Sequence, residues 1–137
     1  MKTIEEKQTE IIEEFSELEN WEDKFQYLVE LGDELSQYPE DKKKEEFRVK
    51  GCESRVWVLP ELKEDKLYFL ADSDTALTKG LIAILVRVLS GHSPEEISKA
   101  KLDFLETIGL KKFLSISRRN GLSSMVTILQ NYAQANR

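Results

Sequence analysis

The segment TALTKGLIAILVRVLS, residues 75–90, constrains the fold more than any other part of the chain. Its apolar residues cover most of the circumference of a helix, which is typical of a helix buried on all sides. Lys79 and Arg87 flank the apolar run, so it stays well short of the roughly 18 uninterrupted apolar residues of a membrane span. We therefore expect 75–90 to be the central core helix of one domain, residues 1–137, with no membrane partner.

Capping signals predict the other helices. Thr3 and Glu6 form a capping box for a first helix, and Asn20 is placed to cap a second. Asp74 is the predicted N-cap of the central helix, and Gly91 lies where a helix-terminating glycine belongs. Three further helical signals follow: the Ser-Pro-Glu-Glu start at 93–96, a stretch around 102–108, and a final helix capped by Ser117.

Between residues 47 and 72 the pattern changes from helical spacing to alternation. The segments FRVK (47–50), RVWVLPEL (55–62) and KLYFLAD (66–72) predict three short strands, with GCES (51–54) as the turn between the first two. Pro60 cannot donate to a strand ladder and marks an edge or bulge position. The predicted fold class is α+β: a small antiparallel three-stranded sheet packed against several helices.

Charge and cysteine content exclude several functions. Residues 1–46 hold 16 acids and 6 bases, a net charge of −10, and the bases of the remainder are scattered. We expect no nucleic-acid partner. One cysteine and one histidine cannot build a zinc cage, so no metal site is expected. The unpaired cysteine and the glutamate-rich N-terminus, which lacks the apolar core of a signal peptide, favour a cytoplasmic protein.

The single cysteine, Cys52, is the main candidate for chemistry. A free cysteine is often a small, inert core residue. Cys52 instead lies in a polar segment beside Gly51, with Lys50 and Arg55 nearby, and positive charge favours the reactive thiolate. These local features leave an inert and a nucleophilic cysteine equally open. His92, the only possible imidazole base, is expected at the surface after a helix end.

Four segments together resemble the SufE family of sulfur-acceptor proteins: NWEDKFQYLVELGDEL (20–35), VKGCESRVWV (49–58), DSDTALTKGLIAILVRVLSG (72–91) and SRRNGL (117–122). They cover nearly the whole chain in the family's order. The resemblance implies a SufE/NifU-like fold. The family phrase G-C-Q-S-Q-V-W differs here at two positions, where Glu53 and Arg55 replace glutamine. We expect this acid and this base, at positions that are usually neutral in the family, to alter the partner surface or the pKa of the thiol, and so to bear on the identity of the partner more than on sulfur transfer itself.

The resemblance also implies a function. Cys52 would accept persulfide sulfur from a cysteine desulfurase, stimulate that enzyme, and pass the sulfur to a scaffold for iron–sulfur cluster assembly. The chain would not be an enzyme and would carry no cofactor, since the pyridoxal phosphate belongs to the desulfurase. The positions implied to bind or order the loop around Cys52 are Gly51, Glu53, Ser54, Arg55, Asp72, Asp74, Arg118 and Arg119.

Two alternatives stay open from the sequence. One is a scaffold-like iron–sulfur protein of the same fold, although scaffolds use about three cysteines. The other is a different thiol-dependent protein, such as a cysteine hydrolase, which would need a histidine base beside Cys52. The identity of the desulfurase, the final sulfur recipient, a homodimer and the ranking of Arg118 against Arg119 also stay open.

Overall fold

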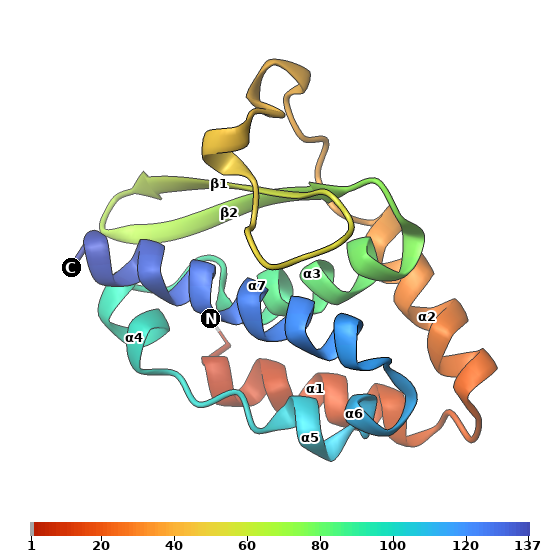
Figure 1. Cartoon of the computed structure of the whole chain (residues 1–137). Coiled ribbons are helices and arrows are strands. Elements are labelled where there is room, and N and C mark those ends of the chain that lie inside the picture. Colours follow the sequence, from red (N-terminus) through yellow and green to blue (C-terminus); the bar gives the residue numbers. More distant parts are fainter. Residues whose placement is uncertain (1) are drawn as a thin grey trace.

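The computed structural model describes residues 2–137 and has the predicted α+β architecture (Figure 1). The β1–β2 hairpin covers one side of α3 and α7, and α1 and α5 lie on the opposite side. No helix within residues 2–137 is long and apolar enough to cross a membrane. In chain order the elements are α1 (Ile4–Ser16), α2 (Trp21–Asp33), η1 (Glu40–Lys42), η2 (Glu45–Phe47), β1 (Val56–Lys63), β2 (Lys66–Ser73), α3 (Ala76–Leu89), α4 (Pro94–Lys99), α5 (Phe104–Thr107), α6 (Leu110–Phe113) and α7 (Ile116–Ala135).

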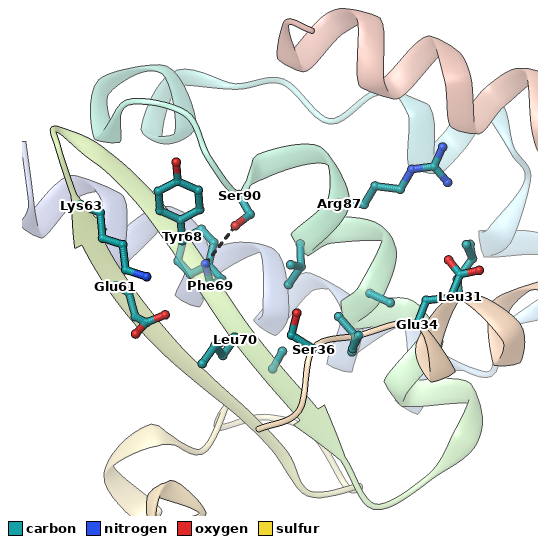
Figure 2. Close-up of a pocket in the computed structure, with 14 residues that line it drawn as sticks. Leu31, Glu34, Ser36, Glu61, Lys63, Tyr68, Phe69, Leu70, Arg87 and Ser90 are labelled. Atoms are coloured by element: carbon teal, nitrogen blue, oxygen red, sulfur yellow. Dashed lines mark hydrogen bonds between the residues drawn. The ribbon is translucent and has the colours of Figure 1, made fainter. Parts of the chain in front are cut away.

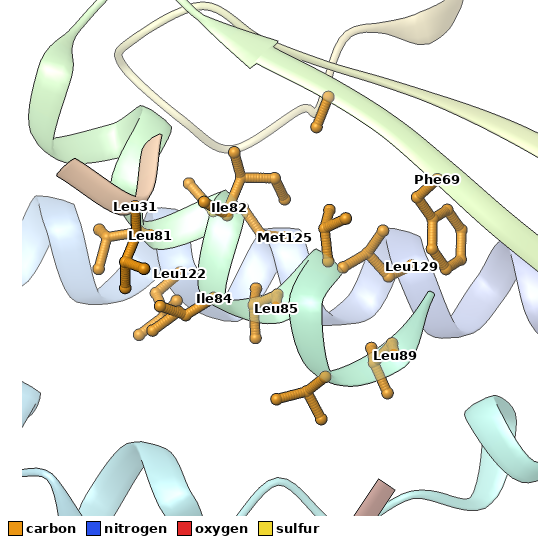
Figure 3. Close-up of a cluster of buried hydrophobic side chains, with 14 of the residues drawn as sticks. Leu31, Phe69, Leu81, Ile82, Ile84, Leu85, Leu89, Leu122, Met125 and Leu129 are labelled. Carbon is orange, nitrogen blue, oxygen red and sulfur yellow. The ribbon is translucent and has the colours of Figure 1, made fainter. Parts of the chain in front are cut away.

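Helix α3 is the central helix, as its sequence predicts. Leu81, Ile84 and Leu85 are at most 1% exposed, and side chains from all around the helix are buried. Figure 3 shows them packed with Met125 and Leu129 of α7 and with Phe69 of β2. Burial of this many large side chains, at about 1.5–3 kcal/mol each, makes α3 the main contributor to the core.

Helices α2 and α3 approach so closely that their backbones touch at two glycines. A Cβ placed on Gly80 would lie 2.3 Å from the carbonyl oxygen of Leu28, closer than any real contact. A Cβ placed on Gly32 would lie 3.0 Å from the backbone nitrogen of Gly80. Only residues without a Cβ permit this spacing, so the two glycines determine how closely α3 packs against α2.

The hairpin is joined by the two-residue turn Glu64–Asp65, in which both residues have positive φ, 49° and 67°. This geometry matches the right-handed twist of paired strands. Pro60 lies opposite Phe69, whose N–H points away from β1 and donates to Ser90 Oγ at 3.0 Å. The Pro60–Phe69 pair is thus a non-hydrogen-bonded pair of the ladder, and proline costs no ladder bond there.

The predicted third strand is wrong: within residues 2–137 the sheet has two strands, and 51–54 is not a strand-to-strand turn. Residues 47–50 contribute one isolated bridge, Arg48 to Trp57, with a 2.8 Å hydrogen bond from the Val49 N–H to the Val56 carbonyl. The pairing is confined by the 3₁₀ turn η2 before it and by Gly51 after it, whose φ of +89° turns the chain away from β1.

Two predicted helix caps are corrected by side-chain contacts. Helix α3 is preceded by Thr75 as N-cap, because the Asp74 carboxylate instead accepts a hydrogen bond from the Arg55 N–H at 3.0 Å. Helix α7 is capped by Ser115 rather than Ser117. The capping boxes at Thr3 and Ser93, and the Asn20 cap, are confirmed. The helical stretch predicted around 102–108 is confirmed as α5, which ends before the left-handed Gly109, and the short helix α6 that follows has no counterpart among the predictions.

His92 is buried, with 4% of its surface exposed, which corrects its predicted surface position. Its Nε2 has no hydrogen-bond partner among the described residues. Burial, followed by the charge of Lys7, lowers the pKa of His92 below its ordinary value, while Glu96 opposes this effect. The folded state therefore binds a proton less readily than the unfolded chain.

We expect the free energy of unfolding to fall as the pH drops below about 6.5, because the unfolded chain then takes up a proton that the folded His92 resists. Urea midpoints at pH 7.5 and 5.5 measure this loss. In the variant His92→Leu the difference between the two midpoints should shrink. An unchanged difference would assign the loss to other groups.

Candidate functional site

Cys52 lies on the loop between η2 and β1, where this loop packs against α7. Its Sγ donates a hydrogen bond to the carbonyl oxygen of Gly121 at 3.4 Å. A Cβ on Gly121 would lie 3.4 Å from that sulfur. The side chain is partly buried, so the thiol is neither a core residue nor open to solvent.

Gly51 brings the loop close to α7. Its φ of +89° is strained for residues with a side chain, and a Cβ there would lie 2.4 Å from Ser124 Oγ. Glycine at position 51 therefore permits both the left-handed turn of the loop and its close approach to α7. The backbone freedom of glycine also suits this position as a pivot about which Cys52 could move.

A small cavity of about 20 Å³ lies beside the thiol. By the usual criterion this is room for about one water-sized group. Leu81 of α3 and Met125 of α7 contribute its apolar wall. Helical spacing of apolar residues indicates only a core position, so the sequence carries no signal for a role of these two at the thiol. The complete lining is Cys52, Glu53, Ser54, Thr78, Leu81, Ser117, Arg118, Gly121 and Met125.

The structure separates the two arginines that the sequence could not rank. Arg118 lines the thiol cavity, and its Nη1 donates to Thr78 Oγ1 at 2.5 Å. Arg119, one residue further along α7, points into a different groove lined by Leu105 and Val126. Consecutive residues on a helix point about 100° apart, so only one of the two can face the thiol.

The two aspartates of the DSD segment order the end of the hairpin and do not line the cavity. Burial opposes ionisation of Asp72, but a hydrogen bond from Lys43, the Ser73 N–H and the charge of Lys79 together lower its pKa. The Lys43 Nζ lies 3.1 Å from the carboxylate of Asp72. Asp74 fixes the start of β1 through the Arg55 N–H. Arg55 itself is absent from the cavity lining.

The environment of Cys52 favours the neutral thiol. Burial raises the pKa of Cys52, and the positive charge of Arg48 offsets only part of this effect. Lys50 and Arg55, which the sequence suggests would favour the thiolate, are not the basic residues that act on the pKa of Cys52. In this conformation Cys52 is a protected thiol and a poor nucleophile, because the thiolate is the reactive form.

Alkylation of Cys52 by iodoacetamide should therefore be several-fold slower in the folded protein than in urea at pH 7.5. The rate of alkylation should rise with pH, and the midpoint of this rise should lie above the ordinary pKa of cysteine. Rates of adduct formation followed by intact mass between pH 7 and 10 measure both quantities. A midpoint at or below the ordinary value would show that the basic side chains outweigh burial.

A second cavity, of about 400 Å³, lies between β2, α2 and α3 (Figure 2). Phe69 and Tyr68 lie along its strand side, and Glu34 and Arg87 lie on its helical side. It contains none of the predicted site residues and no thiol. Among the side chains of residues 2–137, no group of three or more His, Cys, Asp or Glu is placed to hold a metal ion.

The sequence matches a known protein family over most of its length. The model of the SufE family, described as an Fe–S metabolism associated domain, matches residues 9–133. An uncharacterized SufE-like protein of Rhizobium meliloti is 37% identical over 130 residues, covering 91% of this chain and 93% of that protein. SufE-like protein 1 of Arabidopsis thaliana, named chloroplastic/mitochondrial, is 38% identical over 125 residues, covering 90% of this chain and 34% of its own length.

A solved structure shares the fold. The solution structure of a hypothetical protein from Thermus thermophilus superposes with a TM-score of 0.77 over 95% of both chains, at 23% sequence identity. The sequence match covers the Cys52 loop, the hairpin, α3 and most of α7, which are the elements that build the thiol cavity. This chain therefore belongs to the SufE family, whose domain is associated with Fe–S metabolism.

Proposed function

We propose that this protein is a sulfur acceptor, which takes persulfide sulfur from a pyridoxal-phosphate-dependent cysteine desulfurase onto Cys52. The observation that carries the proposal is the position of Cys52. The only cysteine of the chain lies on a loop rather than in the core, beside a cavity with room for about one more atom. Membership of an Fe–S metabolism family supports the same assignment.

The transfer is a thiol exchange. The Cys52 thiolate attacks the outer sulfur of the desulfurase persulfide, the S–S bond within that persulfide breaks, and the desulfurase cysteine leaves as a thiolate. Cys52 then carries one additional sulfur. The absence of a second cysteine in the sequence protects this product, because no neighbouring thiol can displace the outer sulfur as hydrogen sulfide.

The resting position of Cys52 requires a loop movement before transfer. Its thiol is hydrogen bonded to Gly121 and partly buried, while an attacking thiolate needs access to the donor sulfur. Rotation at Gly51 releases the thiol from α7, removes the burial that raises its pKa, and so increases the thiolate fraction. Docking of the desulfurase supplies the free energy for this movement.

In this function the protein acts in the cytoplasm, and a cluster scaffold receives the sulfur. The protein has no turnover of its own and no cofactor, and it acts by removing sulfur from the desulfurase. The scaffold-like alternative differs in a visible way, because an iron–sulfur protein binds iron and absorbs visible light.

Alanine formation from cysteine by the desulfurase of the same organism tests the proposal. Adding this protein should raise the rate at which the enzyme turns over, because the enzyme persulfide is emptied faster. The response should saturate with protein concentration. A flat response, or iron bound to the protein after incubation with ferrous iron and sulfide, would contradict sulfur acceptance and favour the scaffold alternative.

A further inference from the structure

A chain of hydroxyl groups connects Arg118 to the edge of the thiol cavity. The Arg118 guanidinium donates to Thr78 Oγ1 at 2.5 Å, so the Thr78 hydroxyl must use its own proton elsewhere. It lies 3.3 Å from Ser54 Oγ, to which it donates. Thr75 Oγ1 also donates to Ser54 Oγ, at 3.0 Å. The chain therefore runs from a fixed positive charge toward Ser54.

Ser54 is the end of this chain. Its oxygen accepts two hydrogen bonds, and its own proton has no acceptor among the described residues. Ser54 lies two residues from Cys52 and lines the same cavity as Thr78 and Arg118. A hydroxyl whose lone pairs are occupied and whose chain begins at a guanidinium is a polarised donor, suited to an anion.

The resting thiol does not use this donor. Cys52 Sγ donates its proton to the Gly121 carbonyl, and burial raises the pKa of the thiol, so no anion is present to accept from Ser54. A persulfide differs in both respects. Its inner sulfur has no proton to donate to Gly121, and its outer sulfur is more acidic than a thiol and carries the negative charge.

We propose that Ser54, Thr78 and Arg118 bind the outer sulfur of the Cys52 persulfide as an anion inside this cavity. Within this group only Ser54 contacts the sulfur; Thr78 and Arg118 are positioning residues, which act through the hydroxyl of Ser54. This inference rests on the proposed function and specifies its loaded state. Burial of an anion is costly unless it is paired and hydrogen bonded, and the guanidinium and hydroxyl chain meet both requirements. The cavity holds the neutral thiol in one state and the charged persulfide in the other.

The persulfide can be formed without a desulfurase. Cys52 is first converted to its mixed disulfide with thionitrobenzoate, and hydrosulfide is then added. Hydrosulfide attacks Cys52 Sγ, an S–S bond forms, the bond to the aromatic sulfur breaks, and thionitrobenzoate leaves with the electron pair. The near-ultraviolet absorbance of the persulfide anion is then titrated against pH in the native protein and in its variants.

The variants are Ser54→Ala, Thr78→Val and Arg118→Gln, with Arg119→Gln as the matched control. The control removes the same charge from the adjacent residue, which faces another groove. We expect the apparent pKa of the persulfide to rise by about one unit in the first three, a tenfold loss of anion binding, and to stay unchanged in Arg119→Gln. A merely structural role of these residues would not shift this titration.

Equal titration curves in all four variants and the native protein would overturn the inference, as would a shift in Arg119→Gln as large as that in Arg118→Gln. Circular dichroism of each variant identifies any loss of folding, and Ser54→Ala, which removes one oxygen from a partly buried residue, keeps the test open if Thr78→Val unfolds. Because loading is chemical, this result is independent of desulfurase turnover. Failure here with intact stimulation of a desulfurase would remove only this inference.

Discussion

The variant Gly80→Ala is expected to lose about 3 kcal/mol or more of its free energy of unfolding, although alanine is ordinarily favoured over glycine in a helix by about 1 kcal/mol. The new methyl group would lie 2.3 Å from the Leu28 carbonyl oxygen, which belongs to the backbone of α2 and cannot rotate away. Helices α2 and α3 must then separate. Because α3 is the central helix, its displacement also loosens the contacts with β2 and α7.

The chain provides its own controls for this prediction, because it has three helical glycines with graded space. A Cβ on Gly32 would lie 3.0 Å from its nearest backbone atom, and one on Gly121 would lie 3.4 Å from Cys52 Sγ, an ordinary contact. We expect an intermediate loss for Gly32→Ala and no loss for Gly121→Ala. Urea unfolding followed by tryptophan fluorescence measures all three. Equal midpoints for Gly80→Ala and Gly121→Ala would show that α2 and α3 are not in backbone contact.

The variant Cys52→Ser is expected to abolish stimulation of the desulfurase and return alanine formation to the rate of the enzyme alone. Serine keeps the size of the side chain, so the loop should stay packed against α7, yet a hydroxyl cannot accept sulfur by thiol exchange. The variant should still bind the desulfurase and therefore compete with the native protein. Alanine formation in mixtures of the two proteins measures this competition.

A second thiol placed elsewhere provides the matched control. Ser16 is exposed at the end of α1, and its hydroxyl makes only a local bond to Glu13. The double variant Cys52→Ser, Ser16→Cys contains one cysteine, as the native chain does. It should remain inactive, because that thiol has no loop and no cavity beside it. Activity of the double variant, or of Cys52→Ser alone, would contradict the assigned role of Cys52.

Local signals explain which parts of the fold the sequence predicts. Helix α3 follows from its uninterrupted apolar surface, and the capping boxes at Thr3 and Ser93 follow from residues three positions apart. The third strand fails because residues 47–50 have strand-forming side chains but make a single bridge to β1, and Phe47 already belongs to the 3₁₀ turn before it. A strand requires a partner over several residues, which no local pattern reports.

The candidate site around Cys52 could also be predicted only in part from local sequence. The Gly-Cys pair marks the loop correctly, because glycine next to a thiol is a local signal. The cavity depends on Thr78 of α3 and Arg118 of α7, which lie 40 residues apart and meet only in the folded chain. The sequence places basic residues near Cys52 and so favours a thiolate, whereas tertiary burial raises the pKa of the thiol. Desolvation is a property of the whole fold and cannot be read from neighbouring residues.

Acceptance of one sulfur atom by Cys52 from a desulfurase is the step on which the proposed function depends. Its most direct test is the intact mass of this protein after incubation with the desulfurase, cysteine and pyridoxal phosphate, without reductant. We predict a gain of about 32 Da, one sulfur, located by peptide mapping to the fragment that contains Cys52 and removed by a thiol reductant. An unchanged mass, in a mixture whose desulfurase is shown to carry its own persulfide, would contradict the account.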